Sequence, residues 1–169
     1  MRILGVDPGL QVTGYGVIEV SEIAALRKEA SLLEAGVIRT KAGSGIAARL
    51  ARLYRELGEV VDEFKPSAIV IEKLYAHYKH PATAILMAHS RGTVCLLSGV
   101  KNVPLFSIAS THVKKTVTGH GHAGKDQVAG MVQHYLRIKS MKAPADATDA
   151  LAIALAYTFN TKAASGDLK

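Results

Sequence analysis

The chain has 169 residues, of which 49% are hydrophobic and 21% charged, and its formal net charge is +7. This composition is ordinary for a globular protein with one sizeable core, and no apolar run is long enough to span a bilayer. The single Cys95 excludes an internal disulfide and fits a reducing compartment. We therefore expect a cytoplasmic protein without a signal peptide, in which Cys95 is a core residue.

The positive charge is concentrated in the second part of the chain. Residues 73–145 carry ten Lys or Arg against one acid, Asp126, whereas residues 1–72 are close to balance. This division indicates an anionic partner bound on one side, for which nucleic acid is the natural candidate. A basic surface without a partner is the alternative.

The first stretch, Met1–Val17, has the order strand, acid, glycine turn, strand, which predicts an antiparallel hairpin with a second strand over 13–20. Asp7 ends the first strand and is expected at the rim of a sheet, where α/β proteins form ligand sites. Gly9 and Gly14 leave room for a bulky group to approach the backbone beside this acid. The alternative is an ordinary hairpin in which Asp7 only caps the turn.

The rest of the chain predicts alternating strands and helices. The helix over 46–64 is the clearest, because its apolar residues recur at intervals of three and four. After a loop over 21–28, the expected elements are a strand over 31–40, this helix, a strand over 68–71 ending on Glu72, a helix over 81–99, a strand over 103–108, a helix over 110–117 capped by Ser110, and helices over 125–138 and 145–159.

This order predicts an α/β fold of the RNase H-like type. Its mixed five-stranded sheet would combine three antiparallel strands with two parallel ones, flanked by helices. We expect a single domain over residues 1–160 and a polar, disordered tail over 161–169.

Four carboxylates are expected to meet at one rim of this sheet. Asp7 and Glu72 end the two apolar strands, and Asp146 and Asp149, three residues apart, share one face of the last helix. The two helix acids could instead only compensate the helix dipole. Carboxylates gathered at one place repel each other, and a hard divalent cation removes the conflict. The pattern therefore predicts two Mg²⁺ ions, with Mn²⁺ as a substitute, acting on a phosphodiester.

Several segments carry a resemblance to a known family. They are Gly5–Gly9 with Thr13–Gly16, Ile71-Glu72, His112–Val117, Gly124–Val128 and Ala145–Ala152. With these segments in this order, the chain resembles the RuvC family of bacterial Holliday junction resolvases. The resemblance implies a homodimer that resolves four-way DNA junctions in recombination and repair by paired, metal-dependent nicks, leaving 5′-phosphate and 3′-hydroxyl ends. It also implies a partnership with the RuvA–RuvB branch-migration complex.

The resemblance assigns roles to individual residues. It implies catalytic and metal-binding roles for Asp7, Glu72, Asp146 and Asp149, although some members of the family carry His at the position of Asp146. The family's DNA-contacting lysines fall on Lys114 and Lys125, and its base-stacking aromatic falls on Tyr75. The predicted DNA-binding set is completed by Lys73, Lys79 and Lys115. For Tyr75 the alternative is packing on its own domain, and for Lys114 a solvated helix face.

Three other functions compete with this hypothesis. A ribonuclease H or a YqgF-type nuclease would share the fold. An actin-like or sugar-kinase ATP-binding module would need a second phosphate loop and a second copy of the fold, for which the chain is too short. A junction-binding protein without catalysis would not gather carboxylates beside DNA phosphates.

Overall fold

A computed structural model of the chain describes residues 1–27, 29–74, 81–138 and 143–159. Its centre is a five-stranded sheet in the order β3-β2-β1-β4-β5. The strands are β1 (Arg2–Asp7), β2 (Val12–Glu19), β3 (Ser31–Arg39), β4 (Ala68–Glu72) and β5 (Leu105–Ile108). β1, β2 and β3 pair antiparallel, and β4 lies parallel to β1 and β5, so the predicted mixed sheet is confirmed.

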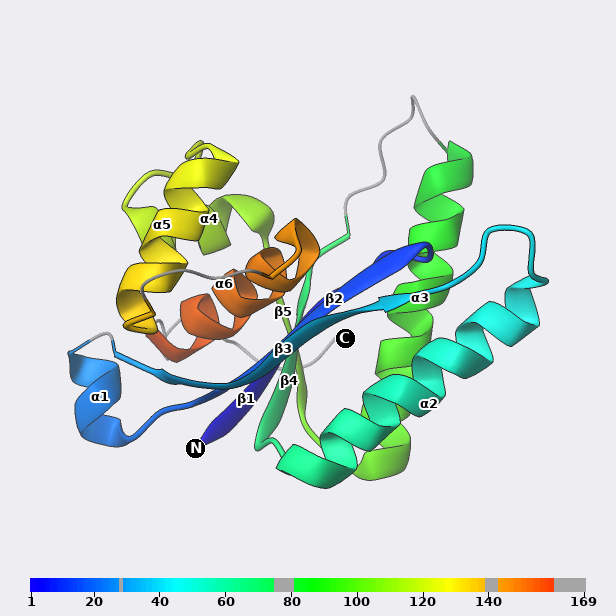
Figure 1. Cartoon of the computed structure of the whole chain (residues 1–169), viewed down its shortest axis with the longest axis horizontal. Coiled ribbons are helices and arrows are strands. Elements are labelled where there is room, and N and C mark those ends of the chain that lie inside the picture. Colours follow the sequence, from blue (N-terminus) through cyan, green and yellow to red (C-terminus); the bar gives the residue numbers. More distant parts are fainter. Residues whose placement is uncertain (28, 75–80, 139–142, 160–169) are drawn as a thin grey trace.

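The helices cover both faces of the sheet (Figure 1). They are α1 (Glu22–Leu26), α2 (Ile46–Phe64), α3 (Pro81–Lys101), α4 (Ser110–Thr118), α5 (Lys125–Tyr135) and α6 (Ala145–Phe159). α2 and α3 lie on one face, whereas α4, α5 and α6 lie on the other. Among the described helices, none combines the length and apolar character that crossing a bilayer requires.

The central strands β1 and β4 are apolar between their ends because both of their faces are buried. In β4, Val70 points into the core beneath α6, and Ile69 and Ile71 point into the core beneath α2 and α3. This alternation follows from the two-residue period of a strand. Cys95 is partly buried against the second of these cores, as predicted.

The backbone of α6 lies directly on the sheet, because β1 and β2 present glycines beneath it. A Cβ on Gly14 would lie 1.9 Å from the Asp146 carbonyl oxygen, and one on Gly5 would lie 2.1 Å from the Ala150 carbonyl oxygen. Gly14 is also the ladder partner of Asp7. The bulky group expected to approach beside this acid is therefore a helix of the protein itself.

Two local predictions were wrong. The segment expected as a loop over 21–28 contains the short helix α1, whose third backbone amide, that of Ala24, donates to the Ser21 hydroxyl at 3.1 Å. Ser110 does not cap α4, because the cap is Ala109 and Ser110 is the first helical residue. Since β5 ends at Ile108, the chain has already entered the helix at Ser110, and its side chain is free for another contact.

Element ends also differ from expectation. β5 begins at Leu105 after Pro104, which has no amide hydrogen for a ladder, and α5 ends at Tyr135, two residues before Arg137 turns to a φ of 55°. Tyr75 and Lys79, and the expected tail over 161–169, lie outside the described residues.

We predict that Gly14→Ala destabilises the fold and displaces the first turn of α6. The added methyl group would overlap the Asp146 carbonyl oxygen, and overpacking of this kind costs about 1–3 kcal/mol or more. Denaturant unfolding measures the loss. Gly43→Ala is the control, since nothing lies within 4 Å of a Cβ there. Equal unfolding midpoints for Gly14→Ala and the wild type would contradict the close contact.

Candidate active site

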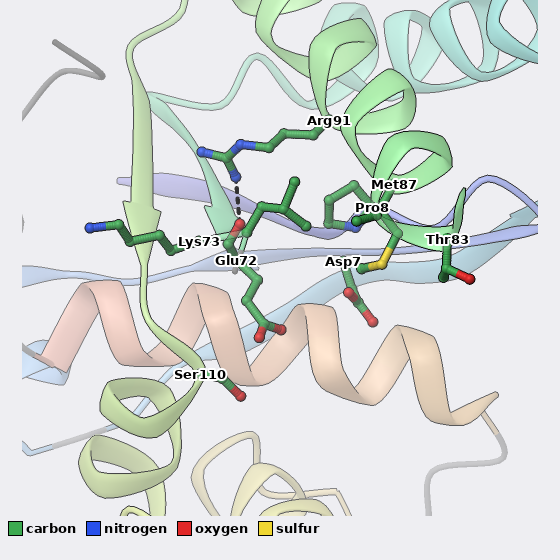
Figure 2. Close-up of a pocket in the computed structure, with 10 residues that line it drawn as sticks. Asp7, Pro8, Glu72, Lys73, Thr83, Met87, Arg91 and Ser110 are labelled. Atoms are coloured by element: carbon green, nitrogen blue, oxygen red, sulfur yellow. Dashed lines mark hydrogen bonds between the residues drawn. The ribbon is translucent and has the colours of Figure 1, made fainter. Parts of the chain in front are cut away.

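Four carboxylates act at the edge where β1 and β4 end, and we call them the carboxylate centre: Asp7, Glu72, Asp146 and Asp149. Asp146 raises the pKa of Asp7 through its charge but lines neither of the two cavities described below. Because β1 and β4 are parallel neighbours with Val6 opposite Ile71, Asp7 and Glu72 leave the sheet side by side. Asp149 comes from α6, and these three acids line one cavity of about 280 Å³. Figure 2 shows the carboxyl groups of Asp7 and Glu72 directed toward α6.

The ionised form of the Asp7 side chain is destabilised in this position. Burial, followed by the charges of Asp149, Glu72 and Asp146, raises the pKa of Asp7 to about 7, against a weaker opposing effect of Lys125. Three acids from the neighbouring strand and the last helix therefore all act on Asp7. The convergence and the repulsion expected from the sequence are both present.

Glu72 is also partly buried and lies near another acid, but two neighbouring groups stabilise its charged form. Burial raises the pKa of Glu72, a hydrogen bond from the Ser110 side chain lowers it, Asp149 raises it and Lys114 lowers it. The first residue of α4 thus helps to hold the negative charge of Glu72.

Two of the predicted lysines lie at the carboxylate centre. The Lys125 ammonium is 3.6 Å from an Asp149 carboxylate oxygen, and Lys114 lines the same cavity. Lys73 follows Glu72 and lines a neighbouring cavity of about 450 Å³. Lys115 is exposed on α4 and lines neither cavity. Lys114 and Lys125 therefore place positive charge beside the acids, whereas Lys115 does not.

The larger cavity lies between the strand ends and α3 (Figure 2). Asp7 and Glu72 form part of its wall, and Pro8, Leu74 and Met87 give it an apolar lining. Arg91 also lines it and reaches the end of β4. The carboxylate centre is therefore open to a ligand on two sides.

The donor set suits a hard divalent cation that shares its ligands with water and substrate. Within the described ranges, no group of three or more His, Cys, Asp or Glu side chains is arranged to hold an ion by itself. Mg²⁺ is ordinarily bound by one or two carboxylates, with waters and substrate phosphates completing the shell. Burial and then the charges of three acids raise the pKa of Asp7, and a divalent ion bound here would offset both effects. The residues thus fit such an ion.

Sequence reasoning missed two residues beside the carboxylate centre. The sequence pattern predicts a cap at Ser110, and only the tertiary structure reveals that its side chain lowers the pKa of Glu72. Arg91 was part of an expected helix without a role, although a lone arginine among small and apolar residues was a usable signal. Its contact with Glu72 depends on tertiary structure.

Comparison with known proteins gives one consistent family. The family model described as crossover junction endodeoxyribonuclease RuvC matches residues 3–157. The RuvC protein of Pseudothermotoga lettingae is 42% identical over 91% of this chain and 91% of its own. That of Rhodopirellula baltica is 40% identical over 90% of this chain and 83% of its own.

A solved structure agrees with these relatives. Thermus thermophilus RuvC, in complex with a Holliday junction substrate, superposes with a TM-score of 0.89 at 30% identity, covering 99% of this chain and 98% of that one. The predicted RNase H-like fold is thereby confirmed.

We predict a pH-dependent stability difference between the wild type and Asp7→Asn in EDTA. The folded pKa of Asp7 is raised from 3.8 to about 7, so its ionisation should destabilise the wild type progressively across that interval. The neutral Asn avoids this cost. The variant should therefore melt several degrees higher above pH 7, and the difference should shrink toward pH 4. A difference in melting temperature between the two proteins that does not change with pH would contradict the raised pKa of Asp7.

Proposed function

The chain belongs to the RuvC family of crossover junction endodeoxyribonucleases, and from this membership we propose that it cuts four-way DNA junctions at the carboxylate centre. Its activity is that of a Holliday junction resolvase, and the cutting of DNA phosphodiesters is the chemistry of its family. The observation that supports this site is that three acids from separate parts of the chain, Glu72, Asp146 and Asp149, all raise the pKa of Asp7.

The proposed roles follow from position. Asp7 ends the strand beside Glu72, and its pKa responds to Asp149 and Asp146 of α6, so Asp7 would be the central ligand for the Mg²⁺ or Mn²⁺ ions. When bound, the ions would lower the pKa of an attacking water and stabilise charge on the leaving 3′ oxygen. Glu72 and the two α6 acids would complete the ligand set, and Ser110 would keep Glu72 ionised.

Lys114 and Lys125 are proposed to hold DNA phosphates beside the acids. In the DNA-free protein Lys125 pairs loosely with Asp149, and this pair can be exchanged for a phosphate once cations neutralise the carboxylates. Tyr75 would stack on a base near the junction centre, with Lys73, Lys79 and Lys115 as further backbone contacts. Cleavage would leave ends that a ligase can seal.

A homodimer would place two such centres on one junction. The outer face of α3 supports this proposal, because Ile85, Leu96 and Val100 are 57%, 59% and 55% exposed. Their spacing puts them on one side of the helix, together with Gly92 and Gly99. An apolar face of this kind fits a second copy in a two-fold arrangement. A cytoplasmic location and the RuvA–RuvB partnership are further proposals from the family resemblance.

We predict that Asp7→Asn abolishes cleavage but retains junction binding. The substitution removes charge from the proposed ligand and keeps its shape, and the rate should fall by more than about 100-fold. The measurement compares nicking of a synthetic junction in Mg²⁺ with binding in EDTA. Asp126→Asn is the control, because Asp126 is exposed on α5. A variant that cuts at nearly the wild-type rate, or a wild type that prefers RNA–DNA hybrids, would refute the proposal.

We predict that Lys114→Ala weakens binding to junctions of every sequence. If the ammonium contacts one phosphate, the slope of log K against log salt should fall by about one. Titrations at several salt concentrations measure this slope. Lys101→Ala is the matched control, because Lys101 is paired with Asp62 on the far side of the fold. An unchanged slope for Lys114→Ala would exclude the phosphate contact.

We predict that Leu96→Glu converts a dimer to a monomer. The charge would enter the apolar face of α3, where it would lack a partner after burial. Light scattering coupled to size-exclusion chromatography measures the mass. Leu26→Glu is the control, since Leu26 is 87% exposed on α1. A monomeric wild type, or a dimeric Leu96→Glu protein, would argue against this interface.

A further inference from the structure

Arg91 connects α3 to the end of the strand that carries Glu72. One terminal nitrogen of its guanidinium donates a hydrogen bond to the backbone carbonyl oxygen of Glu72, as Figure 2 shows. The other donates to the Ser107 hydroxyl at 2.8 Å. A single planar group thus contacts β4 and β5 at once, using the paired donors that distinguish arginine from lysine.

These contacts lie where β4 is about to leave the sheet. Glu72 is the last residue of β4, and the Lys73 amide makes one further bond to Ile108 at 2.8 Å. Ser107 stands opposite Ile71 in the parallel ladder. Without Arg91, the Glu72 carbonyl would lose its side-chain donor at the point where the chain enters a loop.

The base of the Arg91 side chain is itself held firmly. Neighbouring residues of α3, namely Ser90, Val94 and Leu97, are buried, and the latter two pack in the core shared with α2. The guanidinium forms no ion pair with an acid in the part of the chain that the structure describes. Its described partners are neutral oxygens, and the one at Glu72 belongs to the backbone.

We propose that Arg91 is a positioning residue, which fixes the backbone of Glu72 and thereby the direction in which its carboxylate meets a divalent cation. The inference rests on the proposed function, because it concerns the same carboxylate centre. Groups that orient metal ligands without touching the metal typically change affinity or activity by 10- to 100-fold when substituted. Lysine keeps the charge at this position but cannot bridge two oxygens with a planar fork.

The test measures Mn²⁺ binding to the full-length protein without DNA, using the electron paramagnetic resonance signal of free Mn²⁺. Arg91→Lys and Arg91→Gln are compared with the wild type and with Lys101→Ala, a control on the same helix whose ion pair faces Asp62. Ser107→Ala removes one acceptor and leaves the bond to Glu72. Thermal melts of the same samples show whether each variant is folded.

We expect both Arg91 variants to bind Mn²⁺ at least about tenfold more weakly, while junction binding in EDTA stays within about twofold of wild type. Lys101→Ala should be unchanged, and Ser107→Ala should lie between. If Arg91→Gln does not fold, the Mn²⁺ affinity of Arg91→Lys alone decides the result. Folded Arg91 variants with wild-type Mn²⁺ affinity would overturn the proposal. A failure of the proposed function would be recognised by a different result, because the Asp7→Asn protein would then still cleave junctions.

Discussion

The structure depends on the direct contact between the backbone of α6 and the glycines of the two central strands. At Gly5 and Gly14 there is no room for a side chain, because carbonyl oxygens of the helix occupy that space. The contact brings the start of α6 beside the end of β1. Two acids from the last part of the chain therefore reach an acid from its first few residues, and the site exists only because these segments touch.

The same contact brings several carboxylates close together, and the neighbouring lysines offset their repulsion only in part. Asp7 is partly buried near three other acids, and its pKa near 7 expresses the cost of ionising it there. Lys125 and Lys114 offset part of this repulsion, and Ser110 supports Glu72. A site that is more stable when a cation enters is suited to binding one, so the instability is itself consistent with a metal-dependent nuclease.

The strand ends must also be held in place for the carboxylates to act together. β1 and β4 contribute Asp7 and Glu72 from adjacent parallel positions, so their separation is set by the ladder. The turn after Asp7 is secured by the Thr13 hydroxyl, which donates to the Gly9 carbonyl at 2.6 Å. Arg91 makes the corresponding contact after Glu72. Carboxylates on rigid strands with supported ends need little reorganisation before they bind a cation.

Much of the fold and of the candidate site was predictable from the sequence alone. Fully apolar strands that end on Asp7 and Glu72, and the three-residue spacing of Asp146 and Asp149, are local patterns, and they indicated both the mixed sheet and the acids. The identity of the group that approaches Gly14, the helix α1, the effect of Ser110 on Glu72 and the hydrogen bonds of Arg91 were decided only by tertiary structure. Local patterns report which faces are buried. They do not report which distant segment fills the space, because that depends on packing between residues far apart in the chain.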